Sequence, residues 1–352
     1  MISAAVFREL VSGRRRGVVA TAARGLLRVL EWPTGWVVAA RNRRFDRRAA
    51  QIHQVDVPVI CVGNLTLGGT GKTPMVEWIA RWIQQRDVSL AIVSRGYGQG
   101  AEGRNDEALE LAEALPDVPH VQDADRVAAA RRAVEEMAAE LILLDDGFQH
   151  RRLARELDIV LLDATDPWGC EHLFPRGMLR EPIASLARAH VVVLSRADMI
   201  EPTERRAIAD RVEQFAPEAL WCEVEHRADA LVSSSGERQL LGSLSGKRVA
   251  AVCAIGNPAG FRHTLESQGC QLVAWREFAD HHRYTPEDLR SLGDWAGAAR
   301  EELVICTRKD LVKLRVETLA DVPLLALDVQ LSFLTGQEPF EAVLEATIDG
   351  RG

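Results

Sequence analysis

The residues best suited to chemistry lie in a glycine-rich stretch from Val57 to Ala80, which reads VPVICVGNLTLGGTGKTPMVEWIA. A strict phosphate-binding loop reads G-x-x-x-x-G-K-[ST], and here Thr66 stands where that pattern has its first glycine. An apolar strand that runs into a glycine turn and an amphipathic helix lets backbone amides surround phosphate oxygens. We therefore predict a nucleotide cradle made of Thr66, Gly68, Gly69, Thr70, Gly71, Lys72 and Thr73.

Two side chains of this stretch bear directly on the chemistry. In a working cradle the Lys72 ammonium reaches the β- and γ-phosphates, and the Thr73 hydroxyl is a ligand of Mg²⁺. Only four of the 43 basic residues are lysines, which favours a functional role for Lys72. The alternative is a structural glycine turn that imitates a phosphate-binding loop.

A second motif, ELILLDDGFQH from Glu140 to His150, ends an apolar strand in two carboxylates. The strand next to that of a phosphate-binding loop brings such a carboxylate to the metal. If both residues stay extended, Asp145 and Asp146 project to opposite sides, so one faces Mg²⁺ and the other faces the substrate. The alternative is a polar strand end followed by a turn at Gly147.

Three further segments carry candidate polar groups. The loop SRGYGQGAEGRNDEA holds Asp106, a candidate base for an acceptor hydroxyl, although such a loop is often only part of the surface. The segment LFPRGMLREP holds Arg180 and Glu181, and an arginine there neutralises charge on a transferred phosphoryl group unless the turn is simply solvated. ADHHRYT holds His281 and His282, but vicinal histidines without further ligand spacing are weak evidence for a metal site.

From Val57 onward, short apolar runs alternate with amphipathic helical stretches, which is typical of a parallel sheet. The predicted strands are 57–62, 88–94, 140–144, 159–163 and 191–195, and the predicted helices are 72–85, 124–139 and 204–215. A smaller alternation begins near Lys247, after a serine- and glycine-rich boundary between residues 220 and 245. We predict an α/β protein with a P-loop NTPase-like parallel sheet domain at 51–225 and a second, smaller α/β domain at 226–352.

The first 50 residues are strongly basic. They hold eleven arginines against three acidic residues, a net charge of +8, whereas the whole chain of 352 residues has a charge of −8. Between Val18 and Trp32, apolar residues fall on one arc of a helix, and Arg24, Arg28 and Glu31 fall on the other. Such a helix either packs on its own domain or lies in an anionic membrane surface. Apolar runs are too short for a transmembrane helix.

Taken together, these motifs resemble those of the tetraacyldisaccharide 4'-kinases of lipid A synthesis. Six motifs occur over residues 55–315 in the same order as in that family: VGNLTLGGTGKTP, SRGYG, DDGFQHRRLARELDIVLLD, the LREP turn, the ADH step and T-x-KD-x-VK. The resemblance implies an ATP-dependent kinase that phosphorylates the 4'-hydroxyl of a tetraacylated glucosamine disaccharide 1-phosphate. It also implies that a threonine at position 66 is normal for the phosphate-binding loop of this family.

The resemblance further implies roles for individual residues. Either Asp145 or Asp146 would complete a Mg²⁺ site beside the triphosphate of ATP. Asp106 matches the base of the family and His281 the histidine that pairs with it, with His282 as the neighbouring alternative. We therefore expect catalytic roles for Asp106, Asp146, His150, Arg180 and His281, and metal ligands in Thr73, Asp145 and Glu181.

An acceptor with four acyl chains must be met at the bilayer, because each CH₂ group transferred to water costs about 0.8 kcal/mol. The resemblance therefore favours a peripheral enzyme at the cytoplasmic face of the bacterial inner membrane. Its expected partners are the lipid disaccharide 1-phosphate and an anionic membrane surface, and we expect no nucleic acid and no obligate protein partner. Two alternatives remain: a P-loop GTPase, since VVVLSRAD resembles a guanine-reading step, and a non-catalytic nucleotide-dependent membrane scaffold.

Overall fold

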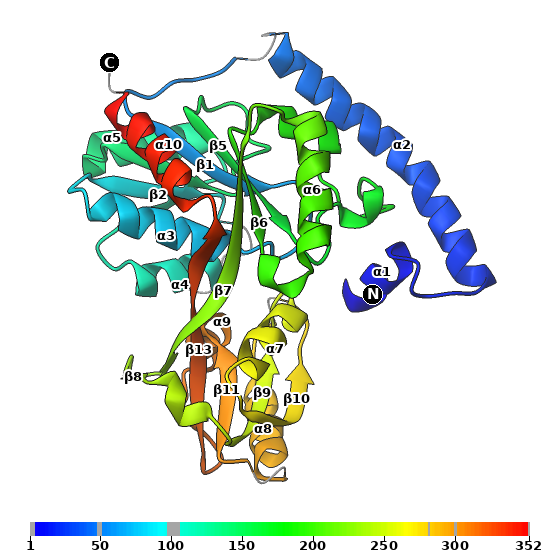
Figure 1. Cartoon of the computed structure of the whole chain (residues 1–352), viewed down its shortest axis with the longest axis vertical. Coiled ribbons are helices and arrows are strands. Elements are labelled where there is room, and N and C mark those ends of the chain that lie inside the picture. The colour runs from blue at the N-terminus through cyan, green and yellow to red at the C-terminus, as the bar shows by residue number, and fades with distance from the viewer. Residues whose placement is uncertain (1–3, 48–50, 97–105, 281, 299–300, 351–352) are drawn as a thin grey trace. The chain divides into compact units, whose positions relative to one another are not determined.

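The computed structural model describes residues 4–47, 51–96, 106–280, 282–298 and 301–350. The chain forms two compact units (Figure 1). Unit 1 comprises Met1–Gln99, Ala114–Glu225 and Phe333–Gly352, and unit 2 comprises Gly100–Glu113 and His226–Ser332. The chain thus leaves unit 1 at Glu225, close to the predicted boundary, but residues 100–113 and 333–352 group differently from the predicted division.

Unit 1 is built on a parallel sheet with the strand order β3-β2-β4-β1-β5-β6-β7. These strands are β1 (Val59–Asn64), β2 (Leu90–Ser94), β3 (His120–Gln122), β4 (Leu141–Asp145), β5 (Leu157–Asp163), β6 (Val191–Ser195) and β7 (Leu220–Val232). Every residue of β1, β2, β4, β5 and β6 is buried, as expected for a sheet covered on both faces. The predicted strands and the parallel sheet are confirmed.

Helices α3 (Lys72–Gln84), α5 (Arg126–Met137) and α6 (Pro202–Phe215) pack against this sheet, close to their predicted bounds. Helix α10 (Gln337–Asp349) was not predicted and also belongs to unit 1. Its Phe340 is fully buried and lies against Trp78 of α3, with ring centroids 5.6 Å apart. This contact explains why the end of the chain groups with unit 1.

The N-terminal segment forms helices α1 (Ala4–Val11) and α2 (Val18–Asp46), and Figure 1 shows α2 as one long helix on the outside of unit 1. The predicted helix ended at Trp32, but α2 continues through Pro33, although a proline inside a helix removes one backbone hydrogen bond and crowds the preceding turn. Among the described helices, none is both long enough and apolar enough to span a membrane.

Unit 2 has a smaller parallel sheet with the order β10-β9-β11-β13. These strands are β9 (Arg248–Cys253), β10 (Gln271–Glu277), β11 (Leu303–Thr307) and β13 (Val322–Thr335), and the short strands β8 (Arg238–Gln239) and β12 (Thr318–Leu319) pair antiparallel with β7 and β13. Helices α7 (Pro258–Glu266), α8 (Pro286–Ala298) and α9 (Arg308–Leu314) alternate with the strands. The predicted smaller α/β unit is confirmed as to class.

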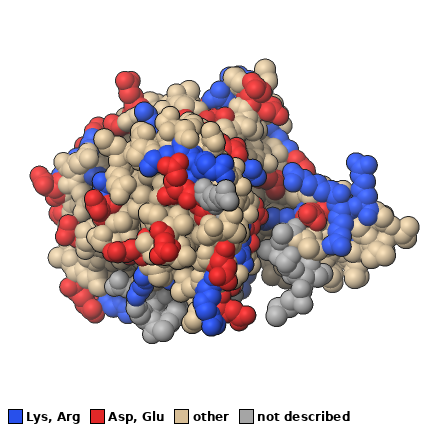
Figure 2. Space-filling view, turned by 90° about the horizontal axis from the view of Figure 1, so that it is seen from below, with Lys and Arg blue, Asp and Glu red and all other residues tan. Residues whose placement is uncertain are grey.

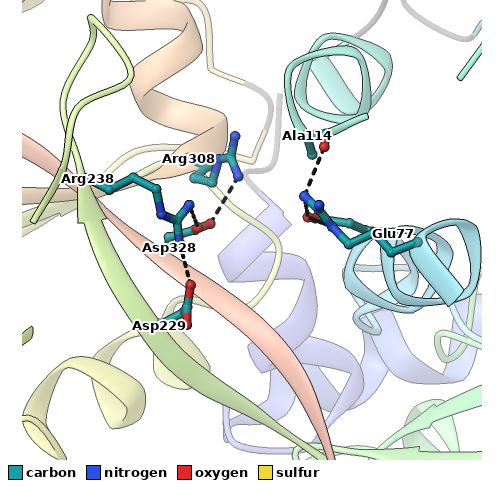
Figure 3. A network of polar contacts seen from close by, with 7 residues as sticks. Glu77, Ala114, Asp229, Arg238, Arg308 and Asp328 are labelled. Carbon is teal, nitrogen blue, oxygen red and sulfur yellow. Dashed lines mark hydrogen bonds and ion pairs between the residues drawn. The ribbon is translucent and has the colours of Figure 1, made fainter. Parts of the chain in front are cut away.

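Ion pairs link β8 to β13 and to the end of β7 that belongs to unit 2, from His226 onward. Arg238 contacts Asp229 of β7 and, at 2.7 Å, Asp328 of β13, which also accepts a hydrogen bond of 3.1 Å from Arg308 (Figure 3). Because Asp328 is buried, its charge requires such partners.

Candidate nucleotide and phosphoryl-transfer site

The glycine-rich loop joins the end of β1 to the start of α3. Gly71 is the N-cap of α3 with φ 84°, and Gly68 has φ 116°, so both adopt conformations that favour glycine. No side chain caps α3 among the described residues. Its first N–H groups have no intrahelical partner and carry the positive end of the helix dipole. This backbone is suited to bind an anion such as a triphosphate.

Thr66 needs no glycine in its place. Its φ is not positive, and it forms an antiparallel bridge with Leu179. Asn64 donates from its side-chain amide to the Thr66 carbonyl at 2.8 Å, and the Thr66 side chain is buried. The departure from the strict loop pattern therefore falls where the chain is still extended, before the turn begins.

Polar side chains from β5 and β6 support the loop, and sequence reasoning missed them. Ser195 donates to the Thr70 carbonyl at 2.7 Å, and Arg196 donates to the Gly69 carbonyl at 3.0 Å. Arg196 is itself paired with Asp163 at 2.6 Å. Among the described residues, the buried Thr70 hydroxyl oxygen has no hydrogen-bond partner, which leaves it available to a ligand. Ser195 and Arg196 of the segment VVVLSRAD thus stabilise the backbone of the cradle.

Lys72 and Arg180 converge on Asp146. The Lys72 ammonium lies 3.4 Å from an Asp146 carboxylate oxygen and 3.4 Å from the Asn64 side-chain oxygen. Arg180 donates to both Asp146 oxygens at 2.9 Å. Burial alone would raise the pKa of Asp146, but Lys72 and Arg180 outweigh it and lower the pKa to about 2. Asp146 is therefore ionised at neutral pH and fixes the lysine beside the loop.

Asp145 and Thr73 are the candidate metal ligands beside the loop. Asp145 is buried at the end of β4, where it pairs in register with Val62 of the adjacent β1, so the predicted adjacency of these two strands is confirmed. Thr73 is buried at the second position of α3. Asp146 has φ 52°, so the strand has already ended and its carboxylate turns to the cations. No group of three or more metal-binding side chains occurs in the described part of the chain. This donor set fits Mg²⁺, which takes one or two protein oxygens and completes its shell with phosphates and water.

Glu181 differs from the expected metal ligand. It is fully buried, and its two carboxylate oxygens accept hydrogen bonds from Arg41 at 2.5 Å and from Arg188 at 2.6 Å. In this arrangement both oxygens are engaged by guanidinium groups, and a metal would have to displace one of them.

His150 lies near a buried cation that sequence reasoning missed. Burial, followed by repulsion from Arg126 and Arg152, lowers the pKa of His150 to about 4, so the imidazole is neutral at pH 7. Arg126 begins α5 and is only 6% exposed, and its Nε has no hydrogen-bond partner among the described residues. Burial and then Arg95 lower the pKa of Arg126, while Asp145 and Asp146 oppose that effect. A buried arginine facing these carboxylates is a candidate for binding phosphate.

The proposed base and its histidine belong to unit 2. Asp106 is the first residue of α4 (Asp106–Ala114), and its side chain, like the whole of His281, lies outside what the structure describes. Lys309 of α9 lies 3.8 Å from Glu110 in the middle of α4. Within unit 1, Arg81 of α3 donates to the last carbonyl of this helix, that of Ala114, at 2.9 Å (Figure 3). Cations thus contact this helix at its middle and at its last residue.

Comparison with known proteins places this geometry in a family. A family model described as tetraacyldisaccharide-1-P 4'-kinase matches residues 23–349. The chain belongs to this family. The resemblance drawn from the motifs is confirmed over nearly the whole chain.

Curated relatives and one solved structure share this similarity. The tetraacyldisaccharide 4'-kinase of Syntrophus aciditrophicus strain SB is 38% identical over 339 residues, covering 89% of this chain and 90% of the relative. That of Anaeromyxobacter dehalogenans strain 2CP-1 is 38% identical over 359 residues, covering 95% and 93%. A crystal structure described as the "apo" form of LpxK from Aquifex aeolicus in complex with ATP matches with a TM-score of 0.74 and 28% identity, over 93% of this chain and 99% of that one.

Proposed function

We propose that this protein is an ATP-dependent kinase that phosphorylates the 4'-hydroxyl of a tetraacylated glucosamine disaccharide 1-phosphate, a step of lipid A synthesis. The observation that carries this proposal is the family match over residues 23–349, which includes the whole phosphate cradle. The uncapped N-terminus of α3, with Lys72 held beside it, supports binding of the ATP triphosphate. The kinase assignment is preferred over a GTPase or a scaffold.

In this reaction the protein itself forms no covalent bond to the phosphoryl group. The acceptor oxygen forms a bond to the γ-phosphorus, and the bond from that phosphorus to the β–γ bridging oxygen breaks. Lys72 and the loop amides hold the phosphates, while Arg180 and Asp146 keep Lys72 in place. The contribution of these groups is positioning and stabilisation of charge. His150, neutral at pH 7, adds no positive charge beside Arg126.

Asp106 is the proposed base that accepts the proton of the acceptor hydroxyl. Its pairing partner is proposed to be His281, since His282 is engaged elsewhere in unit 2. The identity of this base rests on the family resemblance at the start of α4.

Mg²⁺ is proposed to bind at Thr73 and Asp145 when ATP is present. Bound there, the ion would neutralise charge on the β- and γ-phosphates. Glu181 is proposed to orient arginines rather than to bind this ion, because both of its oxygens already accept from guanidinium groups.

The apolar arc of α2 is proposed to lie in the anionic membrane surface where the acceptor resides. Val18, Val19 and Trp36 on this helix are 88%, 84% and 83% exposed. Glu31, on the opposite arc, contacts the backbone amide of Leu173 and the side chain of His172 in unit 1. The helix thus docks by its polar arc. Figure 2 shows basic side chains gathered on the protruding N-terminal part. Such a basic, apolar face fits the cytoplasmic leaflet of the bacterial inner membrane.

The test is incubation with γ-labelled ATP, Mg²⁺ and the acylated disaccharide 1-phosphate, followed by thin-layer chromatography. The wild type should label the lipid, GTP should replace ATP poorly, and Lys72→Met should lose at least about 10²-fold in turnover, as is typical when a charge-stabilising donor is removed. Nucleotide binding and vesicle binding without a labelled lipid would favour the scaffold. A clear preference for GTP would favour the GTPase.

A further inference from the structure

We propose that Arg41 couples the membrane-docking helix α2 to the phosphate cradle, acting through Glu181 as a positioning residue. The inference rests on the proposed function in that it treats the apolar arc of α2 as the membrane-docking surface. All of the contacts that carry it lie within unit 1.

The first step is the grip of α2 on the segment 172–181. Glu31 accepts hydrogen bonds from the Leu173 amide at 2.9 Å and from His172 at 3.2 Å. Ten residues further along the same helix, Arg41 donates to Glu181 at 2.5 Å. The helix therefore holds this segment at both of its ends, and a shift of α2 is transmitted to it.

The second step is the burial of Glu181. The side chain has no exposed surface, so its charge depends on Arg41 and on Arg188, whose guanidinium lies over the Phe148 ring at 4.3 Å. A buried carboxylate is strongly disfavoured when it loses a partner. Arg41 is 42% exposed at its side chain and belongs to α2, so it is the partner that moves with the docking helix.

The third step links this segment to the cradle. The Leu67 amide donates to the Met178 carbonyl at 2.7 Å, and the Arg180 amide donates to the Leu65 carbonyl at 2.7 Å. The segment thus pairs with the backbone that enters the glycine-rich loop. The side chain of Arg180, next to Glu181, holds Asp146, which in turn contacts Lys72. Three contacts, joined by the peptide bond between Arg180 and Glu181, therefore connect Arg41 to the lysine of the cradle.

Coupling between two sites is reciprocal, so a lipid surface that fixes α2 also orders the start of the loop. The readout is hydrogen exchange at the Leu67 and Arg180 amides, measured by NMR without ATP and without acceptor. Vesicles of phosphatidylglycerol and phosphatidylethanolamine supply the surface. Arg41→Gln tests the link. Arg44→Gln is the matched control, because it removes the same charge from an exposed position on the same helix.

At saturating vesicle concentration, exchange at both amides should slow by about tenfold in the wild type and in Arg44→Gln, which is within the usual range of coupling between sites. Arg41→Gln should bind vesicles as Arg44→Gln does but lose this protection. Equal protection in both variants, or no effect of vesicles on the wild type, would overturn the proposal.

Arg41→Lys guards against a variant that fails to fold. It keeps a cation beside Glu181 but not the planar guanidinium, so protection should be retained at least in part, and a loss as complete as in Arg41→Gln would count against the charge contact with Glu181 as the link. Because no phosphate transfer is measured, failure of the proposed kinase reaction and failure of this coupling are seen in different experiments.

Discussion

The imidazole of His282 donates from Nε2 to the Asp288 carboxylate at 3.0 Å and stacks on the Phe278 ring with centroids 4.7 Å apart. It also packs edge-on against Tyr284, with centroids 5.3 Å apart. Through these contacts the side chain of His282 packs within unit 2 at the start of α8. They leave the neighbouring His281 as the imidazole proposed to pair with Asp106.

The two vicinal histidines should therefore respond differently to replacement by alanine. His281→Ala should lower kcat by about 10²-fold or more with little change in ATP affinity, the usual loss when acid–base catalysis is removed. His282→Ala should mainly lower the free energy of unfolding, by about 1–2 kcal/mol, because it removes a hydrogen bond and ring contacts. Steady-state kinetics and urea unfolding check both. If His282→Ala alone abolished turnover, the assignment would be reversed.

Thr66 and Gly71 offer a matched test of the phosphate cradle. Thr66→Gly restores the strict loop pattern but should not improve ATP affinity, and it should cost about 0.5–1 kcal/mol in stability because Thr66 has an ordinary φ. Gly71→Ala should cost about 1–2 kcal/mol because φ is 84° at that N-cap. Isothermal titration with ATP and thermal unfolding measure both effects. Tighter ATP binding by Thr66→Gly would show that the threonine distorts the loop.

His150 should make the stability depend on pH in a defined window. Its folded-state pKa of about 4 lies below the ordinary 6.5, so the unfolded chain takes up the proton first as the pH falls. Wild-type stability should therefore decline from about pH 6.5 to pH 4 by about 2–3 kcal/mol relative to His150→Gln, which lacks the titrating ring. Above pH 7 this effect should be absent. Urea unfolding of both proteins at several pH values measures the difference, and parallel curves would contradict the assignment of a partly buried, neutral imidazole.

Trp32 and Trp36 are 73% and 83% exposed on α2, so their replacement should not disturb the fold. The double change Trp32→Ser and Trp36→Ser should weaken binding to anionic vesicles by about tenfold or more, because aromatic side chains anchor interfacial helices. Flotation with vesicles measures the binding, and thermal unfolding serves as the control. Unchanged flotation would remove this arc of α2 from membrane contact.

Much of unit 1 follows from local pattern. Buried apolar runs with turn residues at their ends marked β1, β4 and β6 to within a few residues, and strand adjacency brought Asp145 beside the loop. The glycines of the cradle could be predicted because a turn that approaches phosphate often needs positive φ, and Gly68 and Gly71 have it. These features depend on residues close together in the sequence.

The remainder depends on partners distant in the sequence. Nothing near Phe340 indicates that it packs on Trp78, so the return of residues 333–352 to unit 1 was not predictable. Glu181 matched the position of a metal ligand, but its partner Arg41 lies 140 residues away. The letters around Arg196 resembled a guanine-reading step, and nothing near it in the sequence indicates its bond to the carbonyl of Gly69, 127 residues away. Only the folded chain shows such supports.

The central claim, that the terminal phosphoryl group of ATP passes to the 4'-hydroxyl of the lipid disaccharide, is tested most directly by the structure of the product. After incubation with Mg²⁺ and ATP, a ³¹P–¹H correlation spectrum of the purified lipid should show a new phosphorus coupled to the proton at carbon 4'. Release of inorganic phosphate with the acceptor unchanged, or a new phosphorus coupled to any other proton, would contradict the account.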